Sequence, residues 1–321
     1  MGKNMFLNTD ALVSELSKIE SFWENNVKTS YITDKNSLKI GVTYIEPQNP
    51  VHQLVIIPGR GETVHKYAEF LYCMDKSHIR TAVLSARGQG IADRLLSNRQ
   101  KCHINNINEE TSDIARLISL IGYKDYGLLA FSLGGLFAID FILGNYSVNK
   151  PRRVALIAPF LWPRSSLNSM LLTAIAFIAG SIPILRETFT PYGQEYKRIS
   201  FKDNYHSHCE IRYNLYHDYY LKHPEFTIGS PTWGFVKEVL LKQRQLAKIQ
   251  TELPVPFFVQ TAQNDMVVSS YATYSFFKKH CNDILRPIVR TIPKAYHDVL
   301  NETDNIRSPA LNGALDFLFG V

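Results

Sequence analysis

Short apolar runs alternate with helix-length stretches along most of the chain, and this alternation constrains the fold more than any other feature. Six runs have the near-continuous apolar character of strands that are buried on both faces. They are residues 54–57, 81–84, 127–131, 154–158, 256–261 and 288–292. The helix-length stretches are residues 63–76, 109–121, 133–143, 269–281 and 309–318. The pattern predicts an α/β fold, with a mainly parallel sheet and helices on both faces.

The alternation is absent at the start of the chain and in a long interval after residue 158. Apolar residues recur at helical spacing over residues 10–23, and residues 30–32 and 38–45 have the character of a β-hairpin. From residue 159 to about residue 252 there is no convincing buried strand. We therefore expect a core formed by residues 1–158 and 253–321, into which residues 159–252 are inserted as a helical cap.

The inserted segment holds the longest apolar run of the chain, residues 170–185. It contains Gly180 and Pro183 and is short for a membrane span. Two interpretations stay open, a buried helix of the cap or a segment that contacts lipid. A tyrosine-rich stretch, residues 213–220, follows it. Its aromatic side chains could fill the interior of the cap or line a substrate site.

Composition limits the partners and the compartment. The 35 Lys and Arg residues exceed the 29 Asp and Glu residues, which gives a net charge of +6. This excess fits phospholipid headgroups or nucleic acid, but no RNP motif, zinc finger or dense basic block favours nucleic acid. No apolar segment of a secretory signal opens the sequence. We expect a cytoplasmic protein, with peripheral contact to the cytoplasmic face of the inner membrane.

The cysteines give no sign of a metal site or a disulfide framework. Four are present, widely spaced and without a C-x-x-C pair: Cys73, Cys102, Cys209 and Cys281. Reduced thiols without a special role are expected in a cytosolic protein. The sequence predicts neither a metal nor a cofactor.

The strongest chemical signal lies in residues 128–135, LLAFSLGG. An apolar strand leads directly into Ser132, and small residues open the apolar helix that follows. This context is typical of a nucleophile elbow, where the nucleophile sits on a sharp, strained turn. Gly134 provides the small neighbour that the turn needs, whereas Ala130 stands where glycine is usual. Ser132 is the predicted nucleophile, and a buried hydroxyl at a strand end is the alternative.

A glycine-containing loop follows the run 54–57 and reads Pro58-Gly59-Arg60-Gly61-Glu62. In folds with a nucleophile elbow, the loop at this place supplies one amide of the oxyanion hole, and the residue after the nucleophile supplies the other. The amides of Arg60 and Leu133 are the expected donors. A simple tight turn is the alternative for the loop.

A base and an acid are expected near the C-terminus. His297 follows the last predicted strand, where this fold presents its base. Asp265 follows the strand before it and lies between Ser132 and His297 in the chain, which is the usual order of the acid. Asp298 is a rival acid but is adjacent to the histidine in sequence. A surface ion pair is the alternative role for Asp265.

With these residues placed, the sequence resembles the bacterial lysophospholipase and monoacylglycerol lipase group of α/β-hydrolases, from about Phe22 to the C-terminus. The motifs that carry the resemblance are Pro58-Gly59-Arg60, Lys66-Tyr67-Ala68-Glu69, Arg87-Gly88-Gln89-Gly90, Ser132-Leu133-Gly134-Gly135, Ala158-Pro159-Phe160, Gly229-Ser230-Pro231-Thr232-Trp233 and Lys294-Ala295-Tyr296-His297. Two positions depart from it. Many relatives have histidine where Pro58 stands and aspartate where Ser85 stands.

The resemblance implies a cofactor-free serine hydrolase with a triad of Ser132, Asp265 and His297. The expected substrate is a lipid ester, most specifically a lysophospholipid, and the fatty acid leaves through an acyl-enzyme. The residues predicted to bind substrate are Gly59, Leu171, Ile175, Tyr213, Tyr216 and Trp233. A monoacylglycerol lipase or broad carboxylesterase is the first alternative, and a non-catalytic binding protein with this fold is a remoter one. The oligomeric state is left open.

Overall fold

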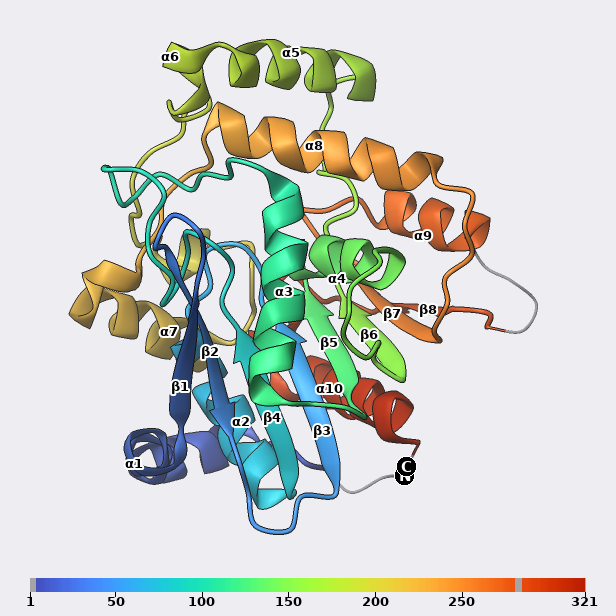
Figure 1. The fold of residues 1–321 in the computed structure, drawn as a ribbon. Helices are drawn as coiled ribbons and strands as arrows, with labels where there is room; N and C mark the ends of the chain where they lie inside the picture. Colours follow the sequence, from blue (N-terminus) through green and yellow to red (C-terminus); the bar gives the residue numbers. More distant parts are fainter. Residues whose placement is uncertain (1–3, 281–284, 321) are drawn as a thin grey trace.

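The computed structural model describes residues 4–280 and 285–320, and within them a single mixed sheet forms the centre of the molecule (Figure 1). Its strand order is β1-β2-β4-β3-β5-β6-β7-β8. The strands are β1 (Lys28–Thr33), β2 (Lys39–Ile45), β3 (His52–Ile57), β4 (Ile79–Leu84), β5 (Gly127–Phe131), β6 (Arg153–Ile157), β7 (Phe257–Ala262) and β8 (Ile288–Ile292). Only the β1–β2 and β2–β4 pairs are antiparallel. The predicted parallel sheet and its N-terminal hairpin are confirmed.

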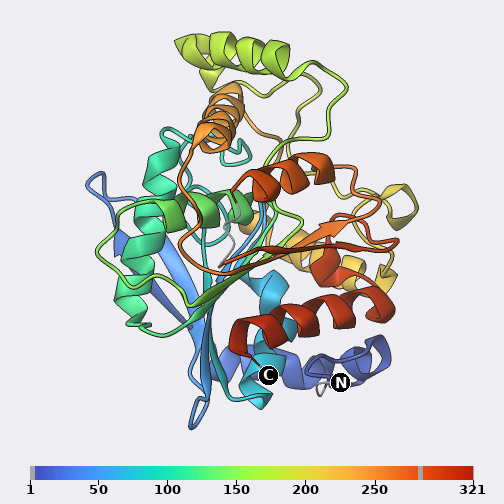
Figure 2. The same ribbon diagram turned by 90° about the vertical axis from the view of Figure 1, so that its right-hand side faces the viewer.

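Helices cover both faces of the sheet, as the apolar pattern predicts (Figures 1 and 2). On one face lie α1 (Thr9–Asn26), α2 (Ala68–Lys76) after the short η1 (Val64–Tyr67), and α10 (Asp304–Phe319) after η4 (Val299–Asn301). On the other face lie α3 (Ile107–Ile121), α4 (Leu133–Leu143) and α9 (Ser270–Lys279). Each face therefore has its own cluster of buried apolar side chains, with the sheet between the two clusters.

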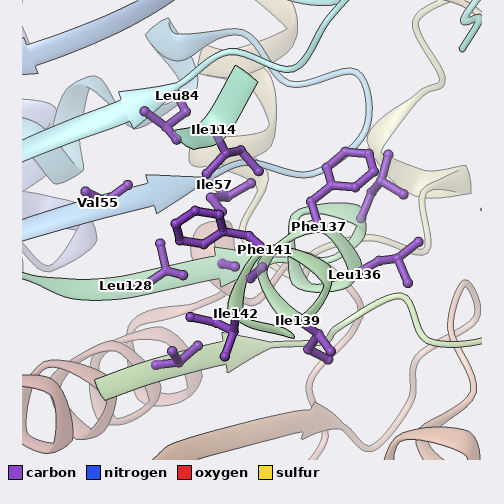
Figure 3. Close-up of a cluster of buried hydrophobic side chains, with 14 of the residues drawn as sticks. Val55, Ile57, Leu84, Ile114, Leu128, Leu136, Phe137, Ile139, Phe141 and Ile142 are labelled. Carbon is purple, nitrogen blue, oxygen red and sulfur yellow. The ribbon is translucent and has the colours of Figure 1, made fainter. Parts of the chain in front are cut away.

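The packing of α4 on the sheet fixes the start of that helix, which begins one residue after Ser132. Figure 3 shows Phe141 of α4 over Val55, Ile57 and Leu128 of strands β3 and β5. All four of these side chains are almost completely inaccessible to solvent. Burial of apolar groups on this scale contributes about 1.5–3 kcal/mol for each large side chain.

The last two predicted helices differ from the observed ones at their ends. The last helix begins at Asp304 rather than at Pro309, so the proline lies inside α10. The Asp304 carboxylate accepts hydrogen bonds from the backbone and hydroxyl of Thr9 and from the Arg212 guanidinium, contacts that no local pattern encodes. At the other predicted helix, α9 ends at Lys279, and Cys281 lies outside the described residues.

Between β6 and β7 the chain contributes no strand to the sheet and forms helices instead. They are α5 (Ser169–Ser181), α6 (Pro183–Arg186), η2 (Phe201–Asp203), α7 (Glu210–Lys222), η3 (Pro224–Phe226) and α8 (Trp233–Lys248). α8 lies over α3 and α4, and α5 lies on the far side of α8 from the sheet (Figures 1 and 2). In the described residues, none of the helices is long and apolar enough to cross a membrane.

Candidate active site

Ser132 occupies the turn between β5 and α4, in a backbone conformation that a non-glycine residue rarely adopts. Its φ is 50° and its ψ is −119°. The turn is held by hydrogen bonds from the Ser132 amide to the Ile157 carbonyl (3.0 Å) and from the Phe160 amide to the Ser132 carbonyl (2.8 Å). A Cβ at Gly134 would lie only 2.3 Å from the Ile57 carbonyl oxygen, so this position requires glycine. Strain of this kind persists only where the surroundings enforce it.

Ser132, His297 and Asp265 form one continuous hydrogen-bonded series. His297 Nε2 lies 2.9 Å from Ser132 Oγ, and His297 Nδ1 lies 2.8 Å from Asp265 Oδ2. The second carboxylate oxygen of Asp265 accepts the amides of Val267 (2.8 Å) and Val268 (2.9 Å). All three side chains are buried. Asp265 and His297 lie in the loops after β7 and β8, at the carboxyl ends of the strands, where the turn at Ser132 also lies.

Asp298 makes a different set of contacts from Asp265. Its Oδ2 atom lies 2.7 Å from Lys66 Nζ and also accepts a hydrogen bond from the side-chain amide of Asn301 at 3.1 Å. Burial by itself would raise the pKa of Asp298, but the Lys66 ammonium outweighs burial and lowers it. Asp298 is therefore engaged with Lys66, and it is Asp265 that lies against the imidazole of His297.

The loop Pro58–Glu62 approaches the serine turn closely. A Cβ at Gly59 would lie 3.2 Å from the Cβ of Ser132. The Gly59 amide donates to Glu62 Oε2, and the Gly61 amide donates to Gln89 Oε1. In the described part of the chain, neither the Arg60 amide nor the Leu133 amide has a protein acceptor, so both remain available to a ligand oxygen. Gln89 lies in the Arg-Gly-Gln-Gly motif, to which the sequence assigned no role.

A cavity of about 440 Å³ opens in front of Ser132 and His297. Tyr213 and Tyr216 of α7, two of the residues expected to bind substrate, line it. The Tyr216 and Tyr220 hydroxyls both donate to the Gly61 carbonyl, so α7 is hydrogen-bonded to the loop before η1. Tyr220 of the same tyrosine-rich stretch lines the cavity as well, together with residues that sequence reasoning did not single out: Lys197, Tyr205, His206, His217 and Ile228.

His206 is a neighbour of His297 that no local motif indicates. The two ring centroids lie 6.2 Å apart. Burial, and then the charge of His297, lower the pKa of His206 to about 4. The ring is therefore neutral at physiological pH, and it presents a hydrogen-bonding group to the cavity without a charge.

Four of the six predicted substrate-binding residues do not line this cavity. Leu171 and Ile175 lie on α5 with 52% and 39% of their surfaces exposed, away from Ser132. The prediction failed because α5 is apolar around most of its circumference, so the sequence does not reveal which face points inward. Trp233 is the first residue of α8, and its backbone amide donates a hydrogen bond to the Thr188 carbonyl. Gly59 contacts the serine turn but is not part of the cavity wall.

A family model described as serine aminopeptidase, S33, matches residues 48–304, which is most of the chain. The chain belongs to this S33 family. The match includes every residue of the hydrogen-bonded series and the loop that approaches it.

Relatives of this S33 member include two curated proteins of similar length. Lysophospholipase L2 of Escherichia coli K12 is 25% identical over 311 residues, which covers 94% of this chain and 90% of the relative. The probable lysophospholipase L2 of Haemophilus influenzae is 26% identical over 317 residues, covering 94% and 95%. At 94% coverage, both alignments include the core as well as the segment between β6 and β7.

Solved structures establish the fold of this S33 member. A soluble variant of monoglyceride lipase from Saccharomyces cerevisiae superposes with a TM-score of 0.71 at 14% identity, over 92% of this chain and 96% of that one. The monoacylglycerol lipase of Paleococcus ferrophilus gives 0.67 at 14% identity, over 91% and 98%. The predicted α/β-hydrolase fold is confirmed.

Proposed function

We propose that the chain is a serine carboxylic-ester hydrolase that releases a fatty acid from lysophospholipids. The observation that carries the proposal is the buried series Ser132–His297–Asp265, which opens onto the cavity. His297 takes the proton of Ser132 as the hydroxyl attacks the ester carbonyl. Asp265 holds the imidazole in orientation and stabilises its charged form.

The amides of Arg60 and Leu133 complete the chemistry as the oxyanion hole. They donate to the oxygen that becomes negative when the ester carbonyl is attacked. One such donor lowers the activation barrier by about 2.7–4 kcal/mol. His297 then protonates the leaving glycerol-type alcohol. In the second step it activates a water molecule, which hydrolyses the acyl-enzyme on Ser132 and frees the fatty acid.

The choice of a lysophospholipid rests on the charges that face the cavity and on the relatives. Arg60 and Lys197 line the cavity, and neither has an ion-pair partner among the described residues. Two unpaired cations suit a phosphate group, which a monoglyceride lacks. Both curated relatives carry the name lysophospholipase L2. The structural neighbours named as monoglyceride lipases keep monoglyceride as the alternative substrate.

The family description raises the alternative of a free peptide amino terminus as the group recognised. A buried carboxylate without a counter-ion would be the natural partner of such an ammonium group. The two buried carboxylates in the cavity wall, Glu62 and Asp298, already share the Lys66 ammonium. This pairing favours an ester substrate.

Fatty-acid release provides the test. Wild type and Ser132→Ala are compared on lysophosphatidylcholine, lysophosphatidylethanolamine, monoolein and an aminoacyl-p-nitroanilide, and both are treated with a fluorophosphonate probe. We expect wild type to cleave the lysophospholipids and to be labelled, and the alanine variant to do neither. Cleavage of monoolein alone would move the substrate to monoglycerides, and cleavage of the anilide alone to peptides. A folded wild type that cleaves nothing and resists the probe would support a binding protein.

We also propose that the outer side of α5 and α6 rests on a lipid surface from which the substrate is drawn. Large apolar side chains are exposed there, and Met170, Ile178 and Ile184 are 72%, 62% and 81% exposed. An exposed apolar helix face of this kind suits the boundary between headgroups and acyl chains. The net charge of +6 adds attraction to anionic lipid. Vesicle binding by variants of the outer face of α5 tests this proposal.

A further inference from the structure

Lys66 is a buried cation that connects the two loops on either side of Ser132. Its side chain is 5% exposed. The ammonium group contacts Glu62 Oε1 on one side and lies 2.7 Å from Asp298 Oδ2 on the other. Burial by itself would lower the pKa of Lys66, but Asp298 and Glu62 outweigh burial and hold the pKa above its usual range. Lys66 therefore remains charged between two carboxylates.

Each carboxylate connects Lys66 to one of the loops that take part in the proposed reaction. On the first side, Glu62 Oε2 accepts the Gly59 amide (2.7 Å) and the Tyr67 hydroxyl (2.7 Å), so Glu62 fixes the residue that precedes Arg60. On the second side, Asp298 directly follows His297. The loop that carries the proposed oxyanion donor and the loop that carries the proposed base are thus joined through one ammonium group.

A third contact directs Lys66 toward the serine turn. Its ammonium lies 5.4 Å from the centroid of the Phe131 ring, and Phe131 is the residue before Ser132. The Phe131 ring is in turn 5.2 Å from the ring of His297. The contacts of Lys66 therefore reach all three backbone segments whose relative placement decides whether base, nucleophile and oxyanion donor are aligned.

From this geometry we infer that Lys66 is a positioning residue, which holds the His297 loop and the Gly59–Arg60 loop in register around Ser132. The inference rests on the proposed function, because it assumes that these loops carry the base and the oxyanion donor. Among the described residues, the Lys66 ammonium hydrogen-bonds to Glu62 and Asp298 and not to Ser132, Asp265 or His297, so it acts through its neighbours. A displacement of about 1 Å in such a constellation can reduce the rate about 100-fold, so the loss of this link should reduce kcat.

The test measures kcat and KM for a short soluble ester in the full-length chain, per active site titrated with a fluorophosphonate. Lys66→Met keeps the length of the side chain but removes its charge, and Lys66→Arg keeps the charge. We expect kcat per titrated site to fall roughly 10- to 100-fold in Lys66→Met, with KM within about threefold of wild type. Lys66→Arg should recover most of the loss. Lys76→Met, at an exposed lysine of α2, is the matched control and should behave as wild type.

Titration of active sites separates positioning from stability. A lysine that only stabilised the fold would reduce the number of labelled sites and the melting temperature, and each surviving site would keep its full kcat. That result would overturn the inference. If Lys66→Met yields too little folded protein, Asp298→Asn tests the same link from the other side, and an unchanged kcat per site there overturns it as well. A wild type that neither hydrolyses esters nor reacts with the probe overturns the proposed function and the inference together, whereas an active wild type isolates the role of Lys66.

Discussion

The segment between β6 and β7 contains two helices of equal length and opposite character, α5 and α7. Both have 13 residues. α5 is strongly apolar, yet its large side chains point outward and only Thr173, Ala176 and Gly180 are buried, on the side that packs against α8. α7 carries charged and aromatic residues, yet Tyr213, Tyr216 and Tyr220 line the cavity, and the last two reach the loop beside Ser132.

Apolar composition is therefore a poor guide to which helix covers the site. α7 is oriented by a polar anchor. The Arg212 guanidinium is almost fully buried, where it pairs with Glu69 of α2 and Asp304 of α10. A buried charge must be paired, and this requirement fixes α7 on the core more specifically than apolar contact would. α5 has no such anchor and depends on close helix packing.

The largest expected effect tests the outward face of α5. Met170→Glu combined with Ile178→Glu should weaken binding to vesicles of phosphatidylethanolamine and phosphatidylglycerol by roughly 100-fold. Each exposed side chain that enters the lipid boundary contributes about 1.5 kcal/mol, and 1.4 kcal/mol corresponds to a factor of ten. Co-sedimentation with vesicles measures the change.

The matched control has the same chemistry on the other helix. Leu215 and Leu221 of α7 are also exposed, by 36% and 59%, and neither lines the cavity. Leu215→Glu with Leu221→Glu adds the same charge and should bind vesicles as wild type does. Equal losses in both double variants would show that general charge, rather than the face of α5, controls binding.

The next effect concerns acid sensitivity, to which two buried histidines on the cavity side contribute. Burial lowers the pKa of both His206 and His217 to about 4. In the unfolded chain a histidine titrates near 6.5, so between pH 6.5 and 4 the unfolded state binds more protons than the folded state. Stability is therefore present above about pH 6.5 and is lost as the pH falls toward 4.

The variant His206→Gln measures how much His206 contributes to this loss of stability at low pH. The free energy of unfolding should fall less steeply with pH in the variant, by up to about 1.4 kcal/mol per pH unit within that window. Urea unfolding at several pH values provides the slope. The same slope in wild type and variant would mean that His206 is protonated equally in both states.

A third experiment tests the close packing on which α5 depends. A Cβ at Gly180 would lie 2.6 Å from the Cβ of Lys237 and 2.7 Å from the Trp233 carbonyl oxygen. Gly180→Ala gains up to about 1 kcal/mol of helix propensity, but the clash with backbone should outweigh it and leave a net loss of about 1.5 kcal/mol. Thermal unfolding and hydrogen exchange of α5 amides report the loss.

The control for Gly180 has the opposite expected sign. Gly313 lies inside α10, and the nearest atom to a Cβ there is Phe258 Cζ at 3.9 Å, an ordinary contact. Gly313→Ala should therefore stabilise the protein by about 0.5–1 kcal/mol. A stabilising effect at both positions would mean that α5 can move away from α8 without cost.

How far the sequence predicts this molecule depends on the range of the interactions involved. The strand pattern and the turn at Ser132 are local, and both were predicted from neighbouring residues. His297 and Asp265 were chosen from their order after the last strands, and the structure brings them to Ser132. Their catalytic roles remain predictions. The direction of α5 was mispredicted, because many faces of an apolar helix satisfy the same pattern.

The contacts made by Lys66 and Arg212 lay beyond sequence reasoning for a related reason. Asp298 is 232 residues from Lys66 in the chain, and Glu69 is 143 residues from Arg212. No spacing rule connects charges over such separations, whereas a helix or strand repeats within a few residues. The motif that contains Lys66 was noticed as part of a resemblance, and Glu62 lies only four residues before Lys66, but the pairing with Asp298 becomes visible only in the folded chain.

The smallest effect concerns the hydrogen bonds by which α7 reaches the loop beside Ser132. The Tyr220 hydroxyl accepts the Thr63 amide (3.1 Å) and the Tyr216 hydroxyl (2.7 Å), and it donates to the Gly61 carbonyl. Tyr220→Phe removes these three hydrogen bonds, and a net loss of about 1 kcal/mol corresponds to a roughly fivefold lower kcat/KM for a soluble ester. Tyr219→Phe is the control on the same helix, since the Tyr219 hydroxyl has no hydrogen bond to the described residues and its ring stacks on His65. If both variants keep full activity, α7 only covers the cavity. If Tyr220→Phe alone loses activity, the polar helix of the pair also holds the loop that bears the proposed oxyanion donor.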